Sequence, residues 1–214
     1  MRRIHRWLAI VLVVPLVVWT VTGLLFHLKP GWSRAYDMLS AERPLASPLP
    51  AAAPDALAQA AGAPIERLEL FGSALGPLYR LTTHDKTLLL DATLHVRSPL
   101  SVDDGRTLAT DAVAHSSHAA DYGAAGEAHI LGGTSGPTVR IAFAHAEVDV
   151  DRASGAVSQR GHDTDRIDWL YRLHYLSWTG NRTLDRLLAV LGLLLVWVVM
   201  IPGIVLFAAR YRRS

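Results

Sequence analysis

The sequence predicts a membrane protein in which two transmembrane α-helices flank an exported α+β domain made of two tandem repeats. Two uncharged apolar runs, residues 7–26 and 187–209, are each long enough to cross the roughly 30 Å hydrocarbon core of a bilayer. Arginines lie outside both runs, as is typical of cytoplasmic flanks. Between the runs, two stretches match at a fixed offset of 60 residues, which indicates an internal repeat.

The first apolar run follows a basic start at residues 2–6, as a secretory signal would. Its 20 uncharged residues exceed a typical signal core, and no A-x-A cleavage pattern follows them. We therefore expect a retained anchor, with a cleaved signal as the alternative. The second run has 23 uncharged residues and spans the bilayer with tilt.

The charge distribution predicts the orientation of the chain. Three arginines precede the first run and three follow the second, so both termini are expected in the cytoplasm. Residues 33–181, with 12 basic and 18 acidic residues, carry −6, and the remaining chain, with 9 basic and 1 acidic, carries +8. The basic pI of 9.1 therefore belongs to the membrane flanks and indicates no nucleic-acid partner. Without cysteine, the exported part has neither disulfides nor thiolate metal sites.

The repeat joins residues 70–91 to residues 130–151 without a gap. The recurring identities are Gly72 with Gly132, Gly76 with Gly136, Pro77 with Pro137, Arg80 with Arg140 and Asp91 with Asp151. Asp91 and Asp151 end predicted strands, where aspartate caps turns. We expect the two units to share one sheet and one core.

Each repeat is expected to begin with a helix and to continue, after a Gly-rich break, with a hairpin of two strands. The helices are "APDALAQAAG", with Asp55 as N-cap after Pro54, and "TLATDAVAHSSHAADYG". The strands are "LYRLTT" and "KTLLLD", then "TVRIAFA" and "AEVDVD", joined by tight turns at "HD" and "HA". The turn "DRASGA" closes the second repeat, with Gly155 suited to a left-handed position.

These patterns divide the chain into eight segments. They are a basic cytoplasmic flank (1–6), the first transmembrane helix (7–28), a linker (29–54), the first repeat (55–102), the second repeat (103–162), a juxtamembrane segment (163–183), the second transmembrane helix (184–209) and a cytoplasmic tail (210–214).

Several of these stretches resemble a known family. "VDVDRASGAV" resembles the strand-turn signature of PepSY domains, which are helix-plus-hairpin units of this size. "IHRWL" (4–8), "TGLLFH" (22–27) and "LYRLHYLSWTGNRTLDRLLAVLGLLL" (170–195) resemble the PepSY-associated transmembrane family. The resemblance covers nearly the whole chain and implies a bacterial inner-membrane protein with a periplasmic domain of two PepSY-like units. Larger relatives include ferric-siderophore reductases, which hold b-type haems with membrane histidines and have four or more spans.

Two histidines at the outer ends of the spans are the main candidate site residues. His27 ends the first span, and His174 precedes the second. Two neutral imidazoles at one depth suit the axial positions of a haem b, and Gly23 would let the cofactor or the neighbouring helix approach closely. Lys29 is a candidate partner for a haem propionate. The alternative is an ordinary interfacial belt that includes Trp32, Tyr175 and Trp178.

Three further histidines are weaker candidates. His5 lies among arginines at the cytoplasmic end, about 33 Å from His27 along a straight helix. A wet basic flank explains it, and a haem there would need a ligand from elsewhere. His115 and His118 are spaced to share one face of a predicted helix, where they would form a partial metal site.

The resemblance favours an inner-membrane haem protein that moves electrons to a periplasmic acceptor, as part of a haem-dependent ferric-siderophore or related iron reduction. Because two helices leave much of a haem exposed to lipid, a homodimer or another inner-membrane subunit is expected. Two alternatives stay open. One is a cofactor-free, membrane-anchored binding or regulatory module, and the other is a periplasmic metal-handling protein. No motif for hydrolytic catalysis is present.

Overall fold

The structure, a computed structural model, describes residues 2–45, 52–133 and 136–212. The chain forms two compact units, which are described separately. The helical unit comprises residues 1–32 and 163–214, and the sheet unit comprises residues 33–162.

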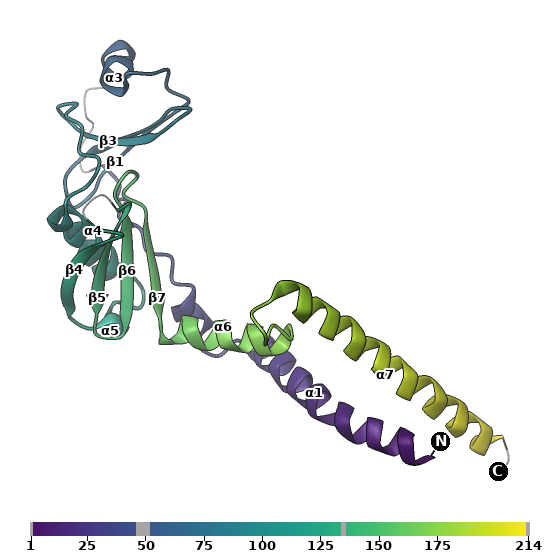
Figure 1. The fold of residues 1–214 in the computed structure, drawn as a ribbon. Helices are drawn as coiled ribbons and strands as arrows, with labels where there is room; N and C mark the ends of the chain where they lie inside the picture. The colour runs from purple at the N-terminus through teal and green to yellow at the C-terminus, as the bar shows by residue number, and fades with distance from the viewer. Residues whose placement is uncertain (1, 46–51, 134–135, 213–214) are drawn as a thin grey trace. The chain divides into compact units, whose positions relative to one another are not determined.

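The helical unit contains α1 (Arg2–Leu28), α6 (His162–His174) and α7 (Arg182–Tyr211). α1 and α7 pack against each other, with both chain ends on one side (Figure 1). The segments Arg6–Leu28 and Arg182–Val205 are long and apolar enough to cross a membrane, and almost none of their surface is buried. Exposed apolar surface of this extent is stable in lipid rather than in water.

The sheet unit consists of short helices and two antiparallel sheets. The elements of the first part are α2 (Trp32–Ala35), α3 (Pro54–Ala61), β1 (Arg67–Phe71), β2 (Leu78–Thr82) and β3 (Thr87–Asp91). Those of the second part are α4 (Val102–Ala114), α5 (Ala119–Tyr122), β4 (Ala125–Leu131), β5 (Thr138–Phe143), β6 (Ala146–Asp151) and β7 (Val157–Gly161). The four strands predicted from the sequence are present, whereas β1, β4 and β7 were not predicted.

The two sheets have equivalent registers but do not join. Their strand orders are β1-β2-β3 and β4-β5-β6-β7. Leu70 pairs with Tyr79 and Ile130 with Val139, so the offset of 60 found in the sequence relates paired residues as well. The expectation of one shared sheet is therefore wrong. On the face of the first sheet that does not carry α3, Leu89 packs in one hydrophobic core with residues of the second sheet. The first sheet therefore packs against the second through this face and does not extend its edge.

A helix covers the corresponding face of each sheet (Figure 1). Leu57 of α3 packs on Leu81 of β2, and Leu108 of α4 packs in the cluster that contains Ile141 of β5, the residue equivalent to Leu81. All four side chains are at most 2% exposed. Gly105 allows α4 to lie close to its sheet, because a Cβ at this position would be only 2.9 Å from Val139 Cβ.

Two helix predictions were wrong at their ends. Ala53, not Asp55, is the N-cap of α3, because Pro54 occupies the first helical position and Asp55 lies in the first turn. The predicted helix that includes His115 and His118 is broken, with His115 capping the end of α4 and His118 preceding α5.

Asp37 explains the break between α4 and α5. Its Oδ2 accepts hydrogen bonds from the Ser116 hydroxyl and from Tyr122 Oη, the latter at 2.9 Å. The His118 amide then donates to Ser116 Oγ at 2.8 Å instead of to a helical carbonyl. Burial and the hydrogen bond to Asp37 raise the pKa of the Tyr122 phenol, so Tyr122 stays protonated and donates at neutral pH.

The repeated aspartates end their strands as turn caps. Asp151 Oδ1 accepts from the Ser154 amide at 2.7 Å, and Asp91 Oδ1 accepts from the Thr93 amide at 2.9 Å. The Thr93 hydroxyl also donates at 2.6 Å and lowers the pKa of the Asp91 carboxyl. Gly155 has φ +69°, the left-handed conformation that its sequence position predicted.

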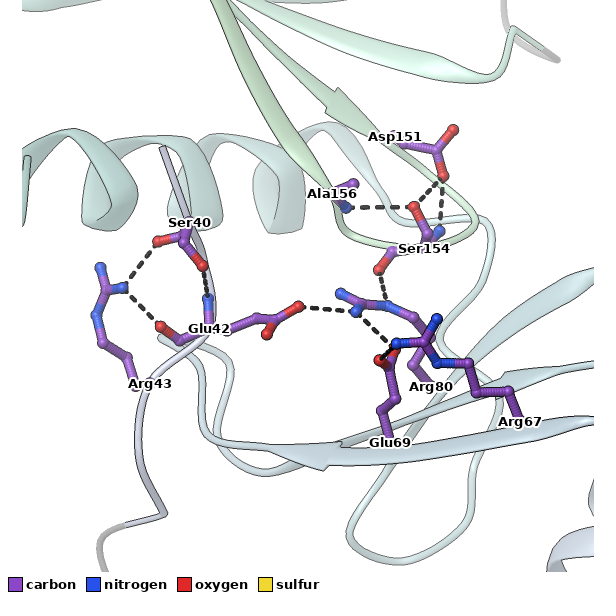
Figure 2. A network of polar contacts seen from close by, with 9 residues as sticks. All are labelled: Ser40, Glu42, Arg43, Arg67, Glu69, Arg80, Asp151, Ser154 and Ala156. Carbon is purple, nitrogen blue, oxygen red and sulfur yellow. Dashed lines mark hydrogen bonds and ion pairs between the residues drawn. The ribbon is translucent and has the colours of Figure 1, made fainter. Parts of the chain in front are cut away.

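Arg80 ties the first sheet to the turn that closes the second repeat (Figure 2). Its Nε donates to the Ser154 carbonyl at 2.8 Å, and Nη1 lies 2.7 Å from Glu42 and 3.0 Å from Glu69. The hydrogen bond from Arg80 lowers the pKa of the Glu69 carboxyl. Because the pKa of Glu69 is lower in the folded protein, its contact with Arg80 stabilises the fold. This stabilisation is fully present above the ordinary pKa of glutamate and is lost as the pH falls through the lowered pKa.

The equivalent arginine of the second repeat has different partners. Arg140 makes a bidentate contact with Asp149 at 2.7 and 2.8 Å and lies 2.6 Å from Glu147, all within its own sheet. The arginine at this position therefore recurs in both sheets, but Arg80 also holds the two sheets together.

Candidate functional site

The turn after α1 positions the start of α6. At Gly31, which has φ +76°, an added Cβ would lie 2.8 Å from Arg166 Nη2 and 2.9 Å from Asp163 Oδ1. Arg166 Nη2 also donates to the Pro30 carbonyl at 3.2 Å. Glycine satisfies both the positive φ and the close approach, so α6 begins against this turn. α6 then runs to its last residue, His174.

His174 packs against α1 through a hydrogen bond to Thr22. Its Nδ1 lies 3.0 Å from Thr22 Oγ1, and this oxygen is 2.8 Å from the Val18 carbonyl and 3.1 Å from the Trp19 carbonyl. The single hydroxyl proton of Thr22 can go to one of these carbonyls or to Nδ1, and Oγ1 accepts from His174 in the first arrangement. In that tautomer Nδ1 carries the proton and Nε2 keeps its lone pair.

This tautomer is the one that metal ligation through Nε2 requires. A ligating histidine usually donates its other ring N–H to a fixed acceptor, which orients the ring and raises its basicity. Thr22 is 3% exposed, and its Oγ1 lies where such an acceptor is needed. No hydrogen bond to His174 Nε2 occurs within the described residues.

Aromatic rings surround the imidazole. Trp19 stacks on His174 with ring centroids 5.4 Å apart and an interplanar angle of 13°. Phe26 and Tyr175 meet it edge to face at 4.9 and 5.5 Å. A Cβ on Gly23 would lie 3.6 Å from His174 Cε1, an ordinary contact distance. The ring therefore lies next to Gly23 but does not require a glycine at this position.

The motif "SWTGNRTLDR" forms the turn from α6 into α7. Asn181 Oδ1 accepts from the amides of Thr183 at 3.0 Å and Leu184 at 3.2 Å, as an N-cap does. Asp185, 8% exposed, accepts from the Thr179 amide at 3.0 Å and hydroxyl at 2.8 Å. These contacts set the direction in which α7 enters the membrane.

The other predicted site residues are not gathered around His174. His27 is exposed on the last turn of α1, and its ring makes no contact with His174 among the described ring pairs. Lys29 Nζ lies 5.7 Å from the centroid of Trp32, a cation–π contact. The side chain of His5 lies outside the described part of the structure.

His115 and His118 each lie beside an aspartate. His115 Nδ1 lies 3.3 Å from Asp111 Oδ1, and His118 Nδ1 lies 3.5 Å from Asp121 Oδ2. Within residues 2–45, 52–133 and 136–212, no group of three or more histidine, aspartate or glutamate residues is arranged to hold a metal ion.

The fit to a b-type haem is carried by one residue. His174 offers an imidazole held at Nδ1 by Thr22, with an apolar, aromatic surround, and both features suit an axial ligand. His27 offers a second imidazole at the same end of α1, exposed and without a fixed partner among the described contacts. The structure thus shows an ordered imidazole at His174 and an exposed one at His27.

Two residues around His174, Trp19 and Thr22, were missed by the sequence analysis. With Gly23 and Phe26, they follow the spacing i, i+3, i+4 and i+7, which places them on one face of α1. A single hydroxyl on an otherwise apolar helical face was the signal that pointed to a polar partner there.

One comparison with known proteins identifies the family. The profile of the PepSY-associated TM region matches residues 2–214. No curated protein and no solved structure matches the chain significantly. The match extends over both apolar helices, the sheet unit and the segment that carries His174. The chain belongs to the PepSY-associated TM region family and is a membrane protein with two transmembrane helices.

Proposed function

We propose that this protein is an inner-membrane haem protein that passes electrons to a periplasmic acceptor, in ferric-siderophore or related iron reduction. The observation that carries the proposal is the hydrogen bond between His174 Nδ1 and Thr22 Oγ1, because a histidine oriented through Nδ1 can present Nε2 to a metal as an axial ligand. A bound haem b supplies one-electron transfer through its iron.

The proposal gives the chain's own residues separate roles. His174 binds iron, Thr22 holds the imidazole in the ligating tautomer, and Trp19 and Phe26 keep water from the ring. His27 is the candidate for the second axial position. His174 packs directly on α1 of its own chain, and the helices of one chain leave much of a haem exposed to lipid. A second copy of the chain, or another membrane subunit, therefore completes the shell around the haem.

The sheet unit is proposed to consist of two PepSY-like repeats that bind the acceptor or a partner protein. The offset of 60 residues, the equivalent strand registers and the helix on the corresponding face of each sheet support two related units. The acidic balance of residues 33–181 suits partners with positive charge.

The visible absorption spectrum tests the haem directly. Full-length protein purified in detergent from haem-replete cells is expected to show a Soret band and, once reduced, the sharp α-band of a six-coordinate low-spin b haem. A folded, monodisperse and colourless preparation would refute the proposal.

The second candidate function is a cofactor-free, membrane-anchored binding module. It is favoured by the complete set of contacts that His174 makes to Trp19, Thr22 and Phe26, since such a cluster also stabilises helix packing without any ligand. The same spectrum separates the two functions.

The proposed orientation places both termini in the cytoplasm and the sheet unit in the periplasm. Arginines flank the two spans on the same side, where the membrane potential and anionic lipids favour them. A reporter active only in the periplasm should work when fused after Asn181 and fail when fused after Ser214. The reverse pattern would overturn this orientation.

A further inference from the structure

A broad open groove lies between the end of α6 and the start of α7, with a volume of about 1040 Å³. Three arginines and three aromatic side chains characterise its wall. They are Trp169, Arg172, Tyr175, Trp178, Arg182 and Arg186. The groove belongs entirely to the helical unit.

The arginines of the groove have no acidic partner. Arg172, Arg182 and Arg186 are exposed and make no ion pair within the described part of the chain. Asp185, the acidic residue of the wall, is 8% exposed and already accepts two hydrogen bonds from Thr179. Three arginines and one aspartate leave the wall with a formal charge of +2.

The groove lies where α7 enters the membrane. The uncharged run of α7 starts at Leu187, directly after Arg186, and Arg182 and Arg186 are one turn apart on the same face. Trp169, Tyr175 and Trp178 are each more than half exposed. Tryptophan and tyrosine favour the headgroup level of a bilayer, where a charged arginine reaches lipid phosphates.

We propose that this groove binds an anionic phospholipid, with the three arginines on its phosphate-bearing head group and the three aromatic rings along its glycerol region. Guanidinium groups bind phosphate oxygens in bidentate pairs, and the site holds enough positive charge to prefer a net negative lipid over a zwitterionic one. The α6 side of the wall is Trp169, Arg172 and Leu173, whereas His174 packs on α1. The groove shares Tyr175 with the surround of His174, but His174 does not line it, and the inference does not depend on haem.

Lipid titration of the full-length protein in detergent, followed by native mass spectrometry, tests the proposal. We expect phosphatidylglycerol to bind at least tenfold more tightly than phosphatidylcholine. Each Arg→Gln change should weaken phosphatidylglycerol binding about fivefold, and the triple variant R172Q/R182Q/R186Q about 100-fold, since each arginine near lipid phosphate contributes about 1 kcal/mol. Inorganic phosphate at millimolar concentration should compete weakly, because it lacks the acyl and glycerol contacts.

Arg212, at the other end of α7, is the matched control, and R212Q should leave binding in the groove unchanged. The triple Arg→Lys variant retains the charge and should keep most of the lipid preference, which separates loss of charge from loss of fold. Equal affinity for the two lipids, or an unchanged affinity in the triple Gln variant, would overturn the proposal.

Discussion

Replacing His174 with alanine is expected to abolish the b-type haem spectrum of the purified protein. The change removes the ordered Nε2 donor, and the iron loses the axial ligand whose orientation the protein sets through Thr22. Haem content per chain, measured with the pyridine haemochromogen assay, should fall at least tenfold. The Soret and α-bands of any residual haem should shift to those of a five-coordinate or rearranged species.

Thr22→Val makes a graded companion variant. It keeps the volume of the side chain and removes the oxygen that is hydrogen-bonded to Nδ1, so haem affinity should fall about 10-fold to 100-fold rather than vanish. His115→Ala is the matched histidine control and should leave the spectrum unchanged, because His115 is exposed at the end of α4. A normal spectrum in His174→Ala would show that other residues hold the haem. A changed spectrum in His27→Ala would identify the second ligand.

Arg152→Met is expected to cause the largest loss of stability in the sheet unit. Arg152 is 8% exposed, and its guanidinium donates to the Leu100 carbonyl and to the Gly136 carbonyl, each at 2.7 Å. Hydrogen bonds from a charged donor contribute about 1.5–3 kcal/mol each, and buried carbonyls without a donor are costly. The free energy of unfolding should fall by about 3 kcal/mol, which lowers the melting temperature by about 10 °C.

Thermal unfolding of the full-length protein in detergent, followed by near-ultraviolet circular dichroism, measures this effect. Arg106→Met is the matched control, because Arg106 is an exposed arginine of α4 in the same unit, and its melting temperature should stay within a few degrees of the parent. Arg152→Lys keeps the charge with fewer directed donors and should give an intermediate value. A melting temperature unchanged by Arg152→Met would show that water or backbone shifts satisfy these carbonyls.

The resemblance of "VDVDRASGAV" to a PepSY strand-turn signature has a physical counterpart in the structure. Asp151 caps the turn, Gly155 takes the left-handed conformation, and Arg152 holds Leu100. The sequence pointed to the first two, because aspartate caps and left-handed glycines are local properties of a few neighbouring residues. It did not point to the role of Arg152, because Leu100 lies 52 positions away in the chain.

The sequence predicted only part of the candidate site, because it shows local properties but not contacts between distant residues. The position of His174 near the membrane boundary follows from the lengths of apolar runs, which are visible in the sequence. Its partner Thr22 lies 152 positions away, so its role depended on how α6 packs against α1. The pairing of His27 with His174 remains a prediction, since the structure places no ring contact between them in the described residues.

The sequence by itself determined the properties that depend on composition, periodicity and short-range turns. These are the two apolar helices, the four predicted strands, the offset of 60 residues and the turn at Gly155. The tertiary structure was needed to show that the sheets remain separate, that Asp37 contacts Ser116 between α4 and α5, and that Thr22 contacts His174. These features depend on contacts between residues far apart in the chain, and such contacts form only when packing brings the segments together.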